Sequence, residues 1–466
     1  MPTYYSDPLS GSHTNDGSAE SPWGSIVSVM ANNKSTLVAG DIVLLRRGYH
    51  GILDVTGVNS SDIFLHAAPG HSPTVRAIRL TNATHWNIRG LTVSTSTTPS
   101  GHADAAVAIS GVTIGTQAVE TSHYNTIQFC NLYTVQDSSA FTAKNWASAK
   151  AGITVSGTNN VIRGNHLYNG GGIQILFHAN NTYVGYNTVE NVGSDCFGLR
   201  GNFCTIEFNL FRNTHKVDAN HNDLFQAWGS TGNIVRNNDL RAYTDPHQPF
   251  ISDGKSSPTG ISITQGIGMF DGTFKNWTIE NNVIRVDHTI GIWILGPEGC
   301  TIRNNTIFRC GAKVWSSKNP PGIRIAAGKT GRAAKNNIVT GNRAMAFALT
   351  PTTNGGSSIG TQSDNVKITT YNDPADGIAP TAPTNLEGSR VTGYGIDLTW
   401  TASTDAGGVA GYDIFRNGDY VGRVRTGTNF FVVRSASGYG TYTIQAFDRR
   451  GNRSVMSAGV SLSSGC

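Results

Sequence analysis

Charged residues are scarce in this chain, because Asp, Glu, Lys and Arg make up only 14% of its 466 residues, where roughly 25% is usual. So few charges disfavour long surface helices, coiled coils and helical repeats. Cysteine is scarce as well: the six cysteines form no CxxC pair, which argues against a disulfide framework and against a zinc site. We therefore expect most of the thiols to be reduced and buried as small apolar groups.

Long apolar runs and basic runs are also missing. No stretch approaches the ~18 residues of a membrane span, and no Lys/Arg run or aromatic RNA-binding motif is present, so neither a membrane nor a nucleic acid is an expected partner. The opening MPTYYSDPLSG has no charged region followed by an apolar stretch, so no signal peptide is visible. The net charge of +5 weakly favours anionic partners.

Glycine and asparagine are abundant and recur in a pattern. The 55 glycines, with many Asn, Ser and Thr, favour short strands joined by tight turns. In one motif, four residues in which apolar side chains alternate are followed by an asparagine and then by a short apolar pair. Examples are VIRGNHL at 161 and TIRNNTI at 301. The shared asparagines are Asn165, Asn187, Asn209, Asn238, Asn282 and Asn305. Their spacings are 22, 22, 29, 44 and 23 residues, which indicates a repeat of about 22.

A second motif lies between the asparagines, as in GITVSG at 152, GIQILF at 172 and GIWILG at 291. Each repeat therefore holds at least two short strands of period 2. A unit of this size cannot bury its own apolar face and must stack on its neighbours. The sequence thus predicts an all-β fold, a right-handed parallel β-helix, with aliphatic columns inside and stacked Asn side chains hydrogen-bonding along its axis.

The N-terminal sequence also resembles a known family. YYSDPLSGSHTNDGSAESPWGSI followed by LVAGDIVLLRRGYHG is similar to the opening of pectate-lyase-like β-helix proteins, and the resemblance spans roughly residues 3–345. It implies a short helix, expected at Ile26–Asn32, that caps the first coil. The family includes lyases, hydrolases, epimerases and non-catalytic adhesins, so it implies a carbohydrate-directed protein that is secreted or virion-associated. Many viral β-helices are trimers, but the sequence leaves the oligomeric state open.

The repeat stops after Tyr371. A Pro/Ala/Thr-rich linker is expected at 372–383, and the segment 384–466 resembles a fibronectin type III domain through IDLTW, GVAGYDIFRNGDYVG and TYTIQAFDRRGNRS. Trp400 would be its core tryptophan and Tyr442 its corner tyrosine. The sequence therefore predicts a β-helix domain at 1–371 and a small β-sandwich that serves as a spacer.

Two insertions point to a functional face. The spacings of 29 and 44 exceed the repeat near HKVDANHNDLFQAWG and RAYTDPHQPFISDGKSSPTGISITQG, both just before a strand of the second motif. We expect both insertions to emerge on one side of the solenoid and to form the sides of a binding cleft there. DPHQ at 245–248 resembles the DPHE motif of mannuronan C5-epimerases, although an Asp-Pro turn is the favoured interpretation.

Polar side chains converge on the same side. Alignment of the second motif predicts one outward column made of Thr154, Gln174, Arg200, Gln226, Trp293 and Arg324. The residues expected to flank it are Asp195, Lys216, Asp218, His221, Asp223, Gln265 and Asp271.

Each of these residues has a candidate role. His221 and Asp223 share a strand face and could transfer protons, with Lys216 as another candidate base. Arg200 could act with them by pairing with a substrate carboxylate, with Gln226 beside it. The candidate sugar-binding residues are Gln265, Trp293, Trp228 and Arg324. The resemblance also implies a possible Ca²⁺ ion, for which the candidate ligands are Asp195, Asp218 and Asp271.

Three functions fit these residues. The first is a lyase that cleaves an acidic, uronate-containing polysaccharide by β-elimination. The second is a glycoside hydrolase in which Asp218 or Asp223 pairs with Asp271 across the scissile bond. The third is a non-enzymatic adhesin or virion tail protein that binds a glycan with the same face. In each case the expected partner is a polysaccharide, and an anionic one is favoured.

Overall fold

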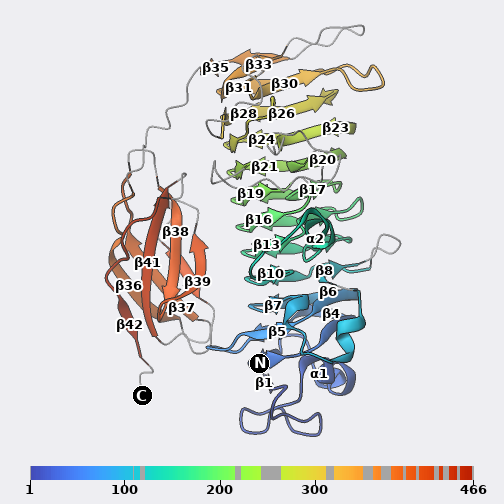
Figure 1. Cartoon of the computed structure of the whole chain (residues 1–466), viewed down its shortest axis with the longest axis vertical. Helices are drawn as coiled ribbons and strands as arrows, with labels where there is room; N and C mark the ends of the chain where they lie inside the picture. Colours follow the sequence, from blue (N-terminus) through green and yellow to red (C-terminus); the bar gives the residue numbers. More distant parts are fainter. Residues whose placement is uncertain are drawn as a thin grey trace. The chain divides into compact units, whose positions relative to one another are not determined.

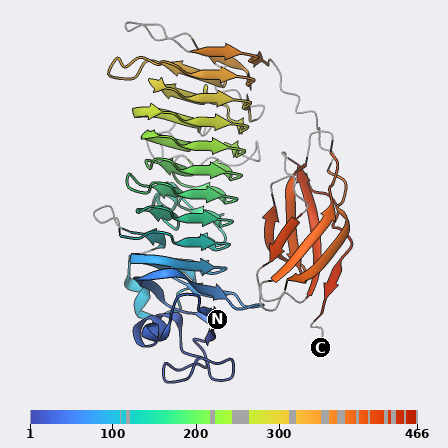
Figure 2. The same ribbon diagram turned by 180° about the vertical axis from the view of Figure 1, so that it is seen from behind.

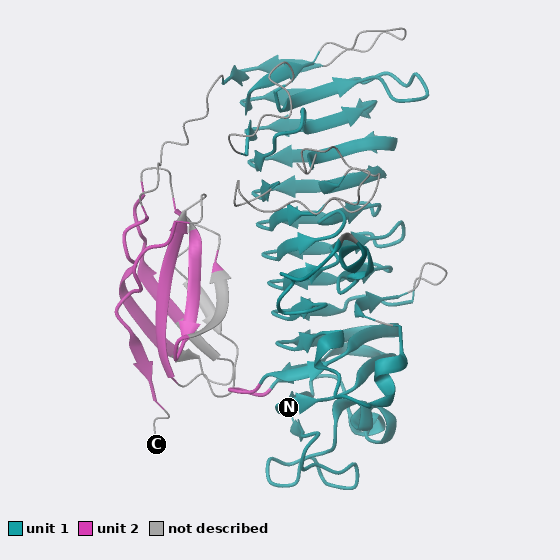
Figure 3. Cartoon of the chain, in the orientation of Figure 1, with its two compact units in different colours: residues 1–67, 72–370 teal, residues 68–71, 371–466 magenta. Residues whose placement is uncertain are grey.

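The computed structural model describes residues 2–108, 110–115, 121–215, 222–242, 264–310, 320–349, 360–368, 379–391, 395–405, 409–424, 430–433, 440–448 and 452–463. The chain divides into two compact units (Figure 3). One comprises 1–67 with 72–370, and the other comprises 68–71 with 371–466. Each unit has a hydrophobic core of its own.

The first unit is a parallel β-helix whose coils stack from the N-terminal end (Figures 1 and 2). One coil shows the plan: β14 (Ile173–Ile175), β15 (Tyr183–Gly185) and β16 (Thr188–Val192) lie in three different ladders. Each of these strands pairs in parallel with its equivalents in the neighbouring coils. The parallel β-helix predicted from the repeat is thereby confirmed.

The strands fall into three ladders. After the N-terminal coils, the first ladder consists of β8 (Gly111–Ile114), β11 (Ile153–Val155), β14, β17 (Phe197–Leu199), β20 (Asp223–Thr231), β23 (Gln265–Lys275), β26 (Ile290–Leu295), β30 (Gly322–Ala326) and β33 (Ala346–Ala348). The second consists of β9 (Thr126–Gln128), β12 (Val161–Arg163), β15, β18 (Thr205–Glu207), β21 (Ile234–Arg236), β24 (Thr278–Glu280), β28 (Thr301–Arg303), β31 (Ile338–Thr340) and β34 (Thr361–Ser363). The third consists of β3 (Gly48–Tyr49), β5 (Pro73–Val75), β7 (Thr92–Val93), β10 (Asn131–Tyr133), β13 (His166–Gly170), β16, β19 (Leu210–Thr214), β22 (Asp239–Arg241), β25 (Val283–Arg285), β29 (Thr306–Phe308), β32 (Arg343–Ala344) and β35 (Val366–Lys367).

The N-terminal coils close one end of the solenoid. Helix α1 (Ile26–Asn32) forms where the sequence predicted a cap; the Ser25 side chain accepts the backbone N–H of Ser28, and Ile26 and Val29 are fully buried in the core. Two long strands, β4 (Ile52–Ala67) and β6 (Ala77–Arg89), run through both the first and the second ladder. The remaining elements are β1 (Thr3–Ser6), β2 (Ile42–Leu45), β27 (Pro297–Glu298), α2 (Ala143–Ser148) and the 3₁₀ turns Lys34–Thr36, Thr95–Thr97 and Ala103–Ala106.

Inward side chains form continuous apolar columns. Ile153, Ile173 and Phe197 stand opposite one another on consecutive coils, and all three are fully buried. The cysteines Cys130, Cys196, Cys204 and Cys300 are free and buried, as expected, whereas Cys310 is only partly covered. Burial raises the pKa of the Cys130 thiol to about 11, so this thiol is an apolar filler at neutral pH.

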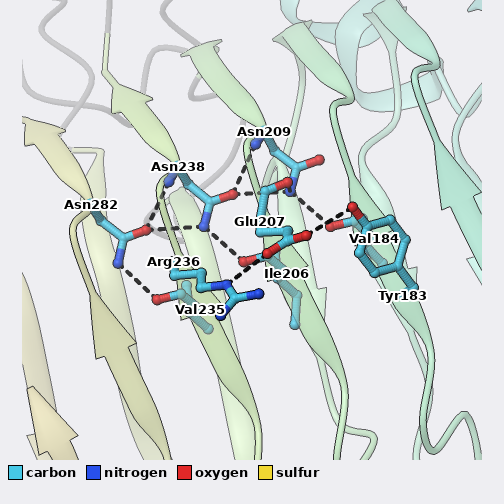
Figure 4. A network of polar contacts seen from close by, with 9 residues as sticks. All are labelled: Tyr183, Val184, Ile206, Glu207, Asn209, Val235, Arg236, Asn238 and Asn282. Atoms are coloured by element: carbon cyan, nitrogen blue, oxygen red, sulfur yellow. Dashed lines mark hydrogen bonds and ion pairs between the residues drawn. The ribbon is translucent and has the colours of Figure 1, made fainter. Parts of the chain in front are cut away.

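Between the second and third ladders the repeating asparagines form a buried ladder (Figure 4). The Nδ2 group of Asn209 donates to Asn238 Oδ1 at 3.0 Å and to the Val184 carbonyl at 3.0 Å. Its Oδ1 atom accepts both the backbone and the side-chain N–H of Asn187, at 2.9 and 3.0 Å. The same pattern continues through Asn238 and Asn282. Each coil therefore fixes the position of the next through several buried hydrogen bonds.

The second unit is a small β-sandwich. A three-stranded sheet contains β36 (Thr384–Val391), β37 (Gly395–Thr401) and β40 (Phe430–Val433), and a four-stranded sheet contains β38 (Val409–Arg416), β39 (Asp419–Val424), β41 (Gly440–Asp448) and β42 (Val460–Leu462). Strands pair antiparallel in both sheets, and Trp400 and Tyr442 are buried in the shared core. The sandwich and its core tryptophan match the prediction, while the fibronectin type III identity and the corner role of Tyr442 remain predictions.

The described part of the chain has no helix that is long and apolar enough to span a membrane.

Truncating one rung of the asparagine ladder should destabilise the β-helix. We expect Asn209→Ala to lower its unfolding free energy by about 2–4 kcal/mol, because the Val184 carbonyl and the Asn187 backbone N–H would lose these buried hydrogen bonds and the Asn187 side chain would lose one of its two acceptors. Asn131→Ala is the matched control, since Asn131 is an exposed residue at a strand start. Chemical denaturation followed by circular dichroism measures both. Equal stability of the two variants would show that the ladder does not hold the coils together.

Candidate functional site

The site is built on the outer face of the first ladder. The strand register aligns one residue from each coil: Thr154, Gln174, Gly198, Gln226, Gly268, Trp293 and Arg324. We call these seven residues the outer column. The sequence prediction placed Arg200 in this column, and that position was wrong. Gly198 stands opposite Gln174 and Gln226, and Arg200 lies two residues further along the chain.

The polar side chains of the outer column are not engaged by the described part of the chain. No hydrogen bond or ion pair joins any of them to another residue of the described ranges. The Trp293 Nε1 and Arg324 Nε atoms are buried and lack a hydrogen-bond partner. Burial lowers the pKa of the Arg324 guanidinium. Because buried donors are normally paired, donors left open in adjacent coils indicate a ligand.

The outer face of the second ladder gives a direct comparison (Figure 4). There the Arg236 Nε atom donates to Glu207 at 2.7 Å, and the Tyr183 hydroxyl donates to the same carboxylate at 3.0 Å. Arg303 pairs in the same way with Glu280 at 2.6 Å. This face satisfies its polar groups internally, whereas the outer column leaves them available.

A carboxylate and an amide reach the outer column at Gly268. Asp223 and Gln265 stand opposite each other at the starts of β20 and β23. A Cβ atom added to Gly268 would lie 3.3 Å from Asp223 Oδ2, 3.4 Å from Gln265 Oε1 and 2.8 Å from the Phe270 ring. Only glycine leaves room at this point, and both side chains therefore reach the ligand-facing side of the strand.

Burial distinguishes this pair from ordinary surface residues. Asp223 is fully buried and Gln265 is 5% exposed, and Gln265 Oε1 accepts no hydrogen bond. The Asp223 backbone N–H donates to Asp195 Oδ1 at 2.8 Å, which fixes the start of β20. Phe270 packs edge-on against Trp293 with ring centroids 5.6 Å apart. The Asp223–Gln265 pair thus lies beside an aromatic wall.

A cation–aromatic stack lies towards the other end of the same strands. The Arg200 guanidinium carbon is 3.4 Å from the Trp228 ring centroid and 5.7 Å from that of Phe177, whose side chain is exposed. Burial lowers the pKa of Arg200, and the charge of Asp195 partly offsets this. Stacking occupies the guanidinium face and leaves its N–H edge for an anionic group.

Two of the three predicted calcium ligands, Asp195 and Asp271, do not come together, and the third, Asp218, lies outside the described residues. Asp195 lies beside Asp223, but Asp271 stands opposite Trp228, five residues further along β20, or about 16 Å at strand spacing. Asp271 also forms an ion pair with Lys329 at 2.5 Å. Within the described ranges no group of three His, Cys, Asp or Glu residues could hold a metal ion. Asp195 and Asp271 therefore do not form a calcium site with each other.

Several predicted features lie outside the described residues. They are Lys216, Asp218 and His221, the 245–248 motif, and most of both insertions. Their roles stay predictions. Conversely, the sequence analysis missed Phe177, Phe270 and the two glycines of the outer column. A signal for the glycines was present, because a glycine at an outward strand position often marks a close approach of a ligand or another chain.

Curated proteins of similar sequence match only parts of this chain. No protein-family model matches it. Chitinase A1 of Niallia circulans is 36% identical over 143 residues, which is 30% of this chain and 20% of that protein. Exoglucanase B of Cellulomonas fimi is 40% identical over 87 residues, which is 19% of this chain and 8% of that protein. The chain therefore spans a fifth or less of these two relatives.

Solved structures are similar at low sequence identity. The Dettilon tailspike protein has a TM-score of 0.49 and 12% identity, with 96% of this chain and 94% of that chain covered. An alginate lyase from Paenibacillus has a TM-score of 0.42 and 12% identity, with 62% and 94% covered. A lacto-N-biosidase from Eubacterium ramulus has a TM-score of 0.42 and 15% identity, with 72% and 67% covered.

Filling the space at Gly268 should disturb the site. We expect Gly268→Ala to destabilise the β-helix by about 1–3 kcal/mol, because the new methyl would clash with the Phe270 ring and crowd Asp223. Gly198→Ala is the matched control in the same column, where the added atom meets only the end of the flexible Gln174 side chain. Chemical denaturation compares the two. A neutral Gly268→Ala variant would contradict the close packing described for this position.

Proposed function

We propose that the β-helix domain is a polysaccharide lyase that cleaves an anionic, uronate-containing polysaccharide on the outer face of the first ladder. One observation carries the proposal: the polar side chains of the outer column have no hydrogen-bond partner among the described residues and lie beside the Asp223 carboxylate. Such polysaccharides lie outside the cell, so the proposal also implies a protein that is secreted or carried on a virion.

The outer column suits an extended chain. From Gln174 to Arg324 it crosses five coil spacings, or about 24 Å at ~4.8 Å per spacing. That length accommodates several sugar units. Trp293 and Trp228 supply apolar faces for sugar rings, and Gln265 offers an amide to hydroxyl groups. Arg324, which has no counter-charge among the described residues, pairs with a carboxylate of the substrate.

The reaction needs a base, a proton donor and neutralisation of the uronate. The base removes the proton from C5, the C4–O4 bond breaks as the C4–C5 double bond forms, and the leaving oxygen takes up a proton. Asp223 is the candidate base, with His221 or Lys216 beside it in the chain to serve the leaving oxygen. Gln226, three residues from Asp223 along β20, is the candidate group for holding the uronate carboxylate, which makes the C5 proton easier to remove. The N–H edge of Arg200, at the other end of the strand, is available to the carboxylate of a neighbouring sugar.

Hydrolysis is the weaker alternative on this geometry. It needs a second carboxylate about 6.5–9.5 Å from the first for inversion, or closer for retention. Asp271 is poorly suited, because it lies five residues along the strand from the Asp223 position and is ion-paired with Lys329. A non-enzymatic glycan-binding protein would use the same face. The product assay described below distinguishes it from an enzyme.

Replacing the candidate base should abolish β-elimination. We expect Asp223→Asn to lower kcat by about 10²–10⁴-fold with little change in thermal stability. The assay follows the near-ultraviolet absorbance of the unsaturated product on a panel of acidic and neutral polysaccharides, with reducing ends counted in parallel. Asp271→Asn is the matched control and should stay within a few-fold.

The outcomes of this assay separate the three functions. Unsaturated product that is lost in Asp223→Asn supports the lyase. Reducing ends without unsaturation, lost in Asp271→Asn, would establish the hydrolase and overturn the proposal. Binding without either product would identify an adhesin.

Arg324 should determine the preference for anionic substrates. We expect Arg324→Gln to raise KM for a uronate polymer about 10–100-fold with kcat nearly unchanged, because a charge-assisted hydrogen bond is lost far from the reacting atoms. Arg303→Gln is the control, since Arg303 is already paired with Glu280 on the second ladder. A KM equal to wild type in Arg324→Gln would remove Arg324 from the binding face.

A further inference from the structure

Strand β23 carries a double bulge at the edge of the candidate site. Its five residue steps from 269 to 274 stand opposite three steps, 227–230, on β20 and three steps, 294–297, on the coil of β26. The two extra residues lie in the segment 270–273, which we call the β23 bulge. Bulges re-aim side chains and are common beside functional sites, so we expect this segment to shape the site.

The β23 bulge determines where the Phe270 ring lies. Because Asp271, and not Phe270, stands opposite Trp228, Phe270 is the first of the extra residues. Its ring would lie 2.8 Å from a Cβ atom added at Gly268. The ring also packs edge-on against Trp293, with the centroids 5.6 Å apart. The bulge thus places an aromatic ring directly beside two residues of the outer column.

An arginine from two coils further on holds the β23 bulge. Arg332 lies in the connection between β30 and β31, and it donates from Nη1 to Thr273 Oγ1 at 2.7 Å and from Nη2 to the Gly272 carbonyl. Its Nε atom donates to the Gly296 carbonyl at 3.0 Å, and Nη2 also donates to the Leu295 carbonyl at 3.4 Å. These hydrogen bonds use most of the guanidinium donors and join the consecutive coils of β23, β26 and β30 (Figure 1).

The path of the guanidinium group requires a glycine. Gly296 has a φ of +60°, and a Cβ atom added there would lie 3.0 Å from both Nε and Nη2 of Arg332. The turn that carries Arg332 is closed by backbone bonds from the Gly328 N–H to the Arg332 carbonyl and from the Gly331 N–H to the Gly328 carbonyl, both at 2.8 Å. Since the acceptors of the guanidinium are carbonyl and hydroxyl oxygens, its role is geometric rather than one of charge pairing.

We propose that Arg332 is a positioning residue of the outer column. By fixing the β23 bulge it keeps the Phe270 ring against Trp293, and the place of that ring sets how tightly a sugar binds beside Trp293. This inference rests on the proposed use of the outer column for a polysaccharide, and it assigns roles to two residues outside that column. Arg332 touches no sugar, and its effect on binding passes through Phe270.

A double-mutant cycle separates positioning from general stability. In the Asp223→Asn background, isothermal titration calorimetry measures the dissociation constant of a polygalacturonate oligosaccharide. We expect Phe270→Ala and Arg332→Ala each to raise it about five- to tenfold, and the two together to raise it no further, because both changes remove the same contact. Lys335→Ala is the matched control. Lys335 lies in the same connection, pairs with Glu298 at 3.3 Å and should leave the affinity unchanged.

A second readout needs no substrate. The contribution of Trp293 to the near-ultraviolet circular dichroism spectrum is obtained by subtracting the spectrum of Trp293→Phe. We expect Arg332→Ala to reduce this contribution as much as Phe270→Ala does, because Trp293 loses its edge-on partner in both variants. If Arg332→Ala does not fold, Thr273→Val replaces it. This variant keeps the side-chain shape, removes one acceptor of Arg332 and should change both readouts in the same direction by a smaller amount.

The outcomes separate this proposal from the proposed function. Additive losses of affinity in the double variant, or an unchanged Trp293 contribution in Arg332→Ala, would overturn the positioning role. A changed spectrum with the parent affinity would overturn it too, because the place of the Phe270 ring would then not set binding. If the Asp223→Asn parent binds no polygalacturonate while the spectrum responds as expected, the proposed substrate is wrong and the positioning of Phe270 by Arg332 stands.

Discussion

The buried asparagine ladder is the interaction on which the rest of the structure depends. Each coil is too small to bury its own apolar face, so its fold is set by how it stacks on the next coil. The side-chain amide of Asn238 makes that stacking specific, because its Oδ1 atom accepts the backbone and side-chain N–H groups of Asn209 while its Nδ2 group donates to Asn282 Oδ1. A fixed register between coils follows, and with it the outward columns in which residues from distant parts of the sequence become neighbours.

The three outward faces use this register differently. On the second ladder opposite charges such as Glu207 and Arg236 alternate and satisfy each other. On the first ladder the outer column makes no polar contacts of its own, and glycine at 268 admits Asp223 and Gln265 from the strand starts. On the third ladder Arg212 pairs with Glu190 and Arg285 pairs with Asp239. The contrast between the paired polar groups of the second ladder and the open ones of the outer column indicates where a ligand binds.

Much of the fold could be predicted from the sequence because its signals are local and repeated. The asparagine motif identified the coils, and the cap helix Ile26–Asn32 formed as expected. The position of Arg200 was wrong by two residues, a shift that leaves the alternation of inward and outward side chains unchanged and is therefore invisible to period-2 patterning. The approach of Asp223 to Gly268 joins residues from two coils separated by an insertion of irregular length, which no local pattern encodes.

The most direct test of the account is a crystal structure of the Asp223→Asn variant with a bound uronate oligosaccharide. The account predicts sugar rings along the outer column between Gln174 and Arg324, with one uronate carboxylate beside Gln226 and its C5 atom next to residue 223. Oligosaccharide bound to another face of the β-helix, or to the C-terminal sandwich alone, would contradict it.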